Sequence, residues 1–520
     1  MPLPADPGQP WPPRHYAPFQ EDAREAAAWY GGDPAELGAL YGGAASTSRT
    51  STGGRFSRFW SRRTASAGDS RQRIHVPLAA DVAATSADLL FGDDPELTIP
   101  EAHGDSPDPG AVACEDRLNQ LAGLLGLTNT MLEAAEIAAG IGGVYLRPGW
   151  DHDVADHPLL DVVHADAAVP EFRWGILTAV TFWRVVSEDN SQVVRHLERH
   201  EPGVIFHGLY RGSKDKLGVK VDMADDASTG ALRARLDETG ALVLPDGVDG
   251  LACRYVPNTL PNRKHRTSPI GRSDCAGTES VMDALDETFT SWMRDIRLGQ
   301  ARLIVPDEFL KKAGRGKGSA FDLDQEIFTP LDMDPAHTER AGISDVQFKI
   351  RFEEHAATAE AHIERVVQTA GYSPQTFGLQ RGAGAGGGDR TATEVRAAEG
   401  KTMRTAARKR RYFEPALEAV LWNLLVIDRA EFTPGLELFR PRVELCDDVD
   451  SDAHRTAETI DLLRRAQAAS TLTLVGMRSP ELEGEELASE VARIQAEQGL
   501  MVNDPTGGLP APGPDEGGLD

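Results

Sequence analysis

Residues 268–306 read SPIGRSDCAGTESVMDALDETFTSWMRDIRLGQARLIVP and contain the strongest helical pattern in the chain. Apolar side chains recur there every three or four residues, which places them on one face of an α-helix. These side chains are Val281, Met282, Leu285, Phe289, Trp292, Met293 and Ile296. We therefore predict one long amphipathic helix, with Ser273 or Asp274 near its N-terminal cap.

A second long helix is predicted after a compact mixed segment. Residues 301–345 combine the strand-like runs ARLIVP and IFTPLDM with a basic loop, KKAGRGKGS. From about residue 347 to residue 370, apolar side chains again share one helical face. These side chains are Ile350, Ala357, Ile363, Val366 and Val367. The pattern indicates two amphipathic helices separated by a small folded insertion.

A glycine-dense loop follows the second helix. Residues 378–390 read GLQRGAGAGGGDR, and ordering so many glycines costs the full backbone entropy. Directly after the loop, TATE at residues 391–394 has the spacing of a capping box, which predicts a helix through about residue 428. Pro415 is expected to kink this helix one turn back.

The segments on either side predict a mixed body and a helical C-terminus. Residues 74–91 and 111–140 have helical spacing, the latter interrupted by Gly123 and Gly126. Residues 143–210 read as short antiparallel strands, with a hairpin turn at residues 201–203. Two further helices are expected at about 454–469 and 481–497, before a Gly/Pro tail at 503–520. The predicted fold class is α+β.

Composition narrows the possible functions. At 520 residues the chain can bury more than one core. Its formal net charge of −27 argues against tight wrapping of nucleic acid, because such binding depends on Lys and Arg neutralising phosphates. The four cysteines lie far apart, which favours a reducing cytoplasm. The sequence shows no signal peptide and no membrane span, so we expect no export and no membrane contact.

Several motifs imitate catalytic or metal sites. HLERH at residues 196–200 has its glutamate in the wrong position for a zinc helix, and its surroundings favour the solvated face of a hairpin. The histidines and aspartates at 151–157 are expected in a polar loop. AGRGKGS at 313–319 lacks the first glycine and the hydroxyl of a phosphate loop, and GAGAGGGD has no preceding strand. We predict no catalytic residue, no metal ligand and no cofactor.

Two basic stretches have contact with nucleic acid as one of their alternative roles. Residues 49–73 interleave arginines with Phe56, Phe59 and Trp60, a pattern typical of either a half-ordered connector or a nucleic-acid patch. The densest basic cluster lies further on, where residues 404, 408 and 411 would share a helical face. This face is either solvated and ion-paired or in contact with DNA or a neighbouring subunit. The cluster consists of Arg404, Arg408, Lys409, Arg410 and Arg411.

Four phrases of the sequence resemble a known family. They are IHVPLAADVAATSADLLFG, PEFRWGILTAVTFWRVV, the stretch at 268–306, and AGYSPQTFGL followed by TATEVRAAE. These phrases are similar to portal proteins of long-tailed phages of high-GC hosts, the SPP1-type portal family of actinobacteriophage-like siphophages. The resemblance covers roughly residues 74–428. It implies a phage portal fold with a mixed α/β wing, two long stem helices, a small α/β clip and a helical crown.

The resemblance also assigns each segment to a part of that fold. An N-terminal segment (1–45) would precede the wing (46–270). The stem helices (271–299 and 347–372) would flank the clip (300–346). The tunnel loop and the long helix after it would occupy 373–428, the crown 429–500 and a disordered tail 501–520.

Three groups of residues carry the implied roles. The tunnel loop at the channel constriction would contain Arg381, Gly382, Gly384, Gly386, Gly387, Gly388, Asp389 and Arg390. The clip residues in reach of DNA or an acidic partner would be Lys311, Lys312, Arg315 and Lys317, although a plain solvated loop is an equal alternative. Stem packing would rest on Leu285, Phe289, Trp292, Ile296, Ile363 and Val367.

Partners and location follow from the same resemblance. The subunit would form a ring of twelve copies through which double-stranded DNA passes. It would bind the terminase large subunit, a head–tail adaptor and the major capsid or scaffold protein. It would be assembled in the host bacterial cytoplasm and reside in the virion at one capsid vertex. The alternatives are a packaging enzyme, meaning a terminase-like ATPase or nuclease, and another head-morphogenesis or minor capsid protein.

Overall fold

The structure is a computed structural model that describes most of the chain. It covers residues 3–4, 6–42, 73–103, 106–189, 191–298, 350–379, 392–445, 453–466, 468–479 and 484–500, with four short strands between 302 and 346. The chain divides into two compact units, Met1–Leu445 and Cys446–Asp520, which we describe separately. Among the described residues, no helix is long and apolar enough to cross a membrane.

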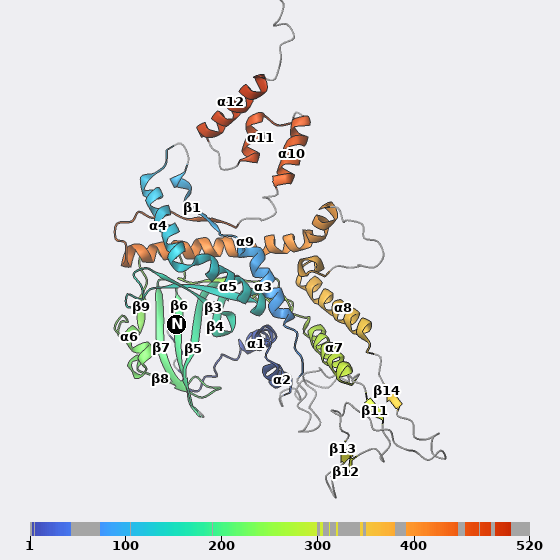
Figure 1. The fold of residues 1–520 in the computed structure, drawn as a ribbon. Helices are drawn as coiled ribbons and strands as arrows, with labels where there is room; N and C mark the ends of the chain where they lie inside the picture. The colour runs from blue at the N-terminus through green and yellow to red at the C-terminus, as the bar shows by residue number, and fades with distance from the viewer. Residues whose placement is uncertain are drawn as a thin grey trace, which may run out of the picture. The chain divides into compact units, whose positions relative to one another are not determined.

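The two largest antiparallel sheets of the described chain belong to the first unit (Figure 1). The larger has the order β4–β5–β6–β7–β8, with β9 also paired to β7, and the smaller has the order β10–β2–β3. The predicted strands and the hairpin turn at Gly203, whose φ is +78°, are confirmed. The strands are β2 (Gly143–Gly149), β3 (Leu159–His164), β4 (Ala168–Arg173), β5 (Ile176–Glu188), β6 (Val193–Glu201), β7 (Val204–Gly212), β8 (Val219–Val221), β9 (Ala241–Val243) and β10 (Arg254–Pro257).

The two faces of the larger sheet have different coverings. On one face, Leu3 and Trp11 of the N-terminal segment pack against Leu197 and Tyr210. Helices α1 (Ala17–Gly31) and α2 (Pro34–Gly42) continue from that segment. The other face packs against the smaller sheet, where Phe182 of β5 lies edge-on to a tyrosine of β2, and it is further bordered by α6 (Ala227–Arg233).

A helical layer supplies the largest apolar core. It consists of α3 (Leu78–Phe91), α4 (Pro109–Leu125), α5 (Leu127–Ile141) and α9 (Ala392–Glu431). Phe91 and Phe413 join α3 to α9, with ring centroids 5.3 Å apart. Gly126, at φ +55°, ends α4 and lets α5 begin in a new direction, so the predicted interruption is confirmed there. Helix α9 is 40 residues long and continues through Pro415. A short pair, β1 (Glu96–Thr98) and β15 (Arg442–Glu444), joins the layer.

The two predicted amphipathic helices are present as α7 (Glu279–Leu298) and α8 (Phe352–Ala370), which lie side by side (Figure 1). The predicted N-terminal cap was wrong, because α7 begins five residues after Asp274. Asp274 is instead buried and held in a turn by an internal ion pair, described below. Of residues 299–349, the structure describes only two strand pairs. They are β11 (Arg302–Ile304) with β14 (Ser344–Val346), and β12 (Lys311–Lys312) with β13 (Ser319–Ala320).

The second unit is helical in its described residues. It contains α10 (Ala453–Arg465), α11 (Thr471–Arg478) and α12 (Gly484–Leu500). The two predicted helices are present, and the short helix α11 between them was missed. Ser470 caps α11 by accepting a hydrogen bond from Thr473 N. The sequence offers this capping signal, but the helix after it has only eight residues. The α+β fold class is confirmed.

Candidate functional site

The α7–α8 pair is anchored in the body at one end. Met282 and Leu285 of α7 and Val366 and Val367 of α8 are buried in one apolar cluster, which also contains Trp29 of α1. Phe289 and Ile363 extend this cluster as half-buried members. The base of the pair is therefore fixed by burial of its apolar stripe, which is the main stabilising term for an amphipathic helix.

Aromatic contacts continue along the pair beyond the buried base. The ring of Trp292 lies 5.8 Å from Phe289, 5.4 Å from Phe352 and 6.0 Å from the stacked ring of His355. Five of the six proposed stem residues, all except Ile296, thus contact neighbours inside the same chain. A charge at Phe289 or Trp292 is expected to damage the subunit itself and not only its association.

The far end of the pair exposes apolar side chains. Met293 and Ile296 on α7 are 36% and 40% exposed, and Phe352 at the start of α8 is 60% exposed. Ile350 precedes α8 and is 38% exposed. Exposed apolar groups are ordinary one at a time, but a cluster of them at one end of a helix pair is typical of an interaction surface.

The charge of the pair is strongly negative. The two helices carry nine carboxylates and three arginines. Near the far end, Asp295 accepts hydrogen bonds from His355 at 3.1 Å and Arg351 at 3.0 Å, and these bonds hold the pKa of Asp295 below its usual range. At the base, Asp286 accepts from Val76 N at 2.9 Å and contacts the His75 imidazole at 2.8 Å. Repulsion between phosphate and such a surface disfavours tight DNA binding.

A buried polar network joins the base of the pair to α3 and α9. The Lys409 ammonium on α9 donates to Asp274 Oδ2 at 2.5 Å, Ser86 Oγ at 2.6 Å and Tyr372 OH at 3.0 Å. Asn258 Nδ2 donates to the second oxygen of Asp274 at 2.8 Å. The network is sealed from solvent, since the Lys409 and Asp274 side chains are 1% and 2% exposed, and this burial lowers the pKa of Lys409 and raises that of Tyr372.

This network divides the basic run predicted on α9. Lys409 and Arg410 are buried, and Arg410 donates to Leu89 O at 3.3 Å. Arg404, Arg408 and Arg411 are exposed, as the shared helical face predicted. The predicted face therefore consists of these three arginines, while helical spacing turns positions 409 and 410 toward α3.

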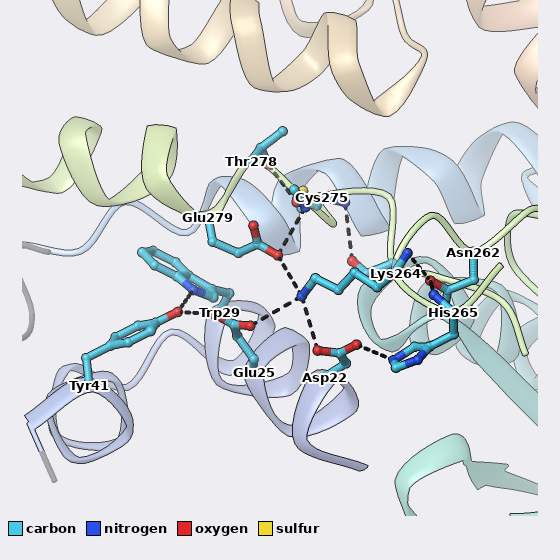
Figure 2. Close-up of polar contacts among 12 residues, drawn as sticks. Asp22, Glu25, Trp29, Tyr41, Asn262, Lys264, His265, Cys275, Thr278 and Glu279 are labelled. Atoms are coloured by element: carbon cyan, nitrogen blue, oxygen red, sulfur yellow. Dashed lines mark hydrogen bonds and ion pairs between the residues drawn. The ribbon is translucent and has the colours of Figure 1, made fainter. Parts of the chain in front are cut away.

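A second polar cluster, centred on Lys264, clamps α1 to the start of α7 (Figure 2). The Lys264 ammonium lies 3.1 Å from Asp22, 3.5 Å from Glu25 and 3.8 Å from Glu279. Burial opposes the charge of Lys264, but these carboxylates raise its pKa. His265 contacts Asp22 at 2.7 Å (Figure 2). The cluster borders a small cavity of about 150 Å³.

The HLERH motif lies on β6, and one part of its interpretation was wrong. His196 and His200 belong to a strand, as predicted, but they are buried and not solvated. The smaller sheet covers this face, a contact between distant segments that strand periodicity does not reveal. His200 contacts Glu198 at 2.6 Å, while His196 stacks on His207 with ring centroids 5.4 Å apart.

These buried groups titrate away from their ordinary ranges. Burial and mutual repulsion lower the pKa of His196 to about 4, and burial lowers that of His207 to about 4. Burial alone would lower the pKa of His200, but the neighbouring Cys253 and Glu198 raise it to about 9. Burial would raise the pKa of Glu198, which Arg147 and His200 nevertheless hold well below its usual range.

Acid should therefore destabilise the fold through His196 and His207. Between about pH 6.5 and pH 4 the unfolded chain binds protons at both histidines while the folded chain does not, so stability is lost as pH falls, by on the order of 3 kcal/mol for each. In His207→Gln, thermal unfolding midpoints should fall less steeply across this window. His152→Gln, an exposed control, should match the wild type. Equal slopes in all three proteins would contradict the assignment.

The remaining predicted residues have different outcomes. All eight tunnel-loop residues, and Arg315 and Lys317, lie outside the described residues. Lys311 and Lys312 form β12. The 151–157 segment is a turn, in which His152 contacts Glu431 at 3.1 Å. Where the chain is described, no group of three or more His, Cys, Asp or Glu side chains is arranged to hold a metal ion.

Comparison with known families identifies the class of protein. Residues 249–488, somewhat less than half of the chain, match the family described as phage portal protein, SPP1 Gp6-like. The match includes α7, α8, α9, α10 and α11. This match supports the assignment of the chain to the tailed-phage portal proteins. Within that class the matching family is the SPP1-type one, so the resemblance inferred from the sequence is confirmed. No curated protein matches the chain.

Proposed function

We propose that this chain is a ring subunit through which double-stranded DNA is packaged into and ejected from a phage capsid. The match to a portal family supports a structural component of the phage particle and an oligomer at the capsid. The observation that carries the finer proposal is the α7–α8 pair, whose apolar stripe continues past the part that the chain itself buries. Side-by-side packing of such pairs around an axis would cover these side chains.

The acidic surface of the pair supports a role as a conduit. Seven of the nine carboxylates on the two helices are not buried, and a ring of such pairs would have a wall that repels phosphate from every side. DNA then slides and is not gripped, because binding strength depends on phosphates neutralised by cations. The predicted tunnel loop at 378–390 and the predicted clip at 300–346 are assigned to the constriction and to the face that meets terminase and adaptor.

The parts and partners inferred from the sequence complete this proposal. The wing, the stem helices and the crown keep the boundaries given above, and the ring has twelve members. The major capsid or scaffold protein would contact its outside. The ring would be built in the host cytoplasm and kept in the virion at one vertex, without a cofactor or metal.

A packaging enzyme is the rival from another class. The test is nucleotide turnover by the purified protein, with and without double-stranded DNA. We expect no hydrolysis above a buffer blank, because the packaging ATPase would be a separate terminase. Stoichiometric, DNA-stimulated hydrolysis would favour the rival.

Shortening the glycine-rich loop tests the channel assignment. Deleting residues 383–387 should leave ring assembly intact but lower the number of DNA-filled heads by at least tenfold, because a constriction loop must move as the duplex passes. The measurement is DNA packaged per head in a defined packaging reaction. A matched deletion in the 503–520 tail serves as the control. Normal packaging by the loop variant would contradict the assignment.

A further inference from the structure

The tip of the β4–β5 hairpin contains a residue that local backbone chemistry does not explain. Arg173 and Ile176 pair across a two-residue turn, in which Trp174 has φ +54° and Gly175 has φ +80°. Two consecutive positive φ values define a type I′ turn, for which Asn-Gly is the preferred sequence. A bulky residue at positive φ is a strained outlier. In the described part of the chain, Trp174 is the one non-glycine residue with positive φ.

Trp174 is also fully exposed. Its relative exposure is 103%, and the neighbouring Ile176 is 69% exposed. Trp174 therefore strains the turn without contributing buried apolar area to the subunit. A residue that breaks a local rule without compensation inside the fold is expected to serve a contact outside it. Tryptophan is one of the residues enriched in the energetic centres of protein interfaces.

The same sheet contains a cavity of about 650 Å³, within the range of roughly 300 to 1,000 Å³ of ligand-sized pockets. Its floor is the polar face of β5, β6 and β7, and Leu232, Arg235 and Leu242 stand at its side. The Arg235 guanidinium already lies over the ring of Trp150, 5.2 Å from its centroid. The lining is mixed, with Leu232 and Leu242 beside charged side chains that include Arg147, Asp161, Arg184 and Glu198. Its apolar groups suit a flat aromatic ring by burial, and its arginines suit it by cation–π attraction.

Two lining residues, Trp183 and His207, each have a buried ring nitrogen without a hydrogen-bond partner in the described part of the chain, and the His207 nitrogen is the one that can accept. His207 Nε2 is buried and has no hydrogen bond within the described residues, whereas its Nδ1 lies 3.3 Å from His196 Nε2. With the hydrogen on Nδ1, His207 donates to His196 and its Nε2 remains a free acceptor. In this tautomer an indole N–H, which is a donor without acceptor capacity, would complete the hydrogen bonding of His207 Nε2.

Trp174 cannot reach this cavity in its own subunit. The cavity floor begins at Phe182 on β5, and a strand rises about 3.3 Å per residue, so roughly 20 Å of strand separates Phe182 from Ile176 at the hairpin. A projecting group and a cavity at different places on one molecule form a head-to-tail contact, which closes into a ring when the rotation between copies permits it.

We propose that Trp174 of each subunit inserts into the cavity over β5–β7 of the next subunit, so that the partner at this surface is a second copy of the chain. The proposal rests on the proposed ring function and adds a specific contact to it. Other occupants of the surface, such as a capsid protein, are outcomes of the test below.

Trp174→Asn is the informative variant, because Asn-Gly fits the turn and the subunit should fold at least as well as before. The protein concentration at which rings appear, measured by mass photometry, should rise by roughly 30-fold, the effect of losing an interface hot spot. Leu232→Trp, which fills the cavity with a side chain of the same subunit, should raise this concentration in the same way. Val219→Asn, at another exposed apolar position on the same sheet, should assemble as the wild type.

A cysteine pair tests the contact itself. Trp174→Cys combined with Leu232→Cys should give a ladder of disulfide-linked oligomers after oxidation, and neither single variant should. If the wild type forms rings, no ladder appears and Trp174→Asn assembles normally, the contact is overturned but the ring function stands. The same conclusion follows if Trp174 proves to bind a capsid protein. Failure of the wild-type chain to form any ring would overturn both.

Discussion

Lys409→Met should destabilise the first unit by roughly 3 to 5 kcal/mol, because it leaves the Asp274 carboxylate buried without its cation. Lys409 and Asp274 are about 1% and 2% exposed, so water cannot replace the lost partner. The measurement is the midpoint of thermal and denaturant unfolding, followed with soluble yield. Such a loss is a large fraction of the stability of an ordinary domain.

Two further variants distinguish the contribution of the ion pair to stability from the contribution of side-chain packing. Removing both charges, as Lys409→Met with Asp274→Leu, should restore part of the stability, because no unpaired charge remains buried. Arg411→Met lies on the exposed face of the same helix and should change the midpoint little. A single Lys409→Met variant as stable as the wild type would show that the network does not hold α9 to the base of the helix pair.

Charges at the far end of the helix pair should abolish assembly while sparing the subunit. Met293→Glu with Ile296→Glu places carboxylates at positions that the monomer leaves 36% and 40% exposed, so folding should be preserved. In a ring these positions would face a neighbouring pair that is already acidic, and buried like charges cost several kcal/mol at each contact. We expect monomers with normal circular dichroism and no rings by size-exclusion chromatography.

The control for this variant is a glutamate at an exposed apolar position elsewhere. Val243→Glu on β9, where the valine is 72% exposed, should assemble normally. Rings formed by Met293→Glu with Ile296→Glu at wild-type yield would mean that the far end of the pair does not contact a neighbour.

Periodicity predicted the elements of this fold well. The apolar repeat in residues 281–296 and the strand alternation of residues 143–210 are local signals, and the helices and strands lie where they indicate. The glycine at 126 also marked a real interruption, because a positive φ is a local requirement.

Contacts between distant segments were not predictable in the same way. Asp274 and Lys409 are 135 positions apart, so nothing in the neighbourhood of either residue signals their pairing. The helix cap assigned to Asp274 was wrong for this reason, as was the solvated reading of His196 and His200. The turn at Trp174 has a local signal, since Trp-Gly stands where a two-residue hairpin turn favours Asn-Gly.

Electron microscopy of the purified, negatively stained protein is the most direct measurement. Moderate salt should be used, so that the net charge of −27 is screened between subunits. Class averages should show closed rings with a central hole, with twelve repeats around the axis. Fields of single subunits, or filled particles without a hole, would contradict the proposal that this chain builds a DNA conduit.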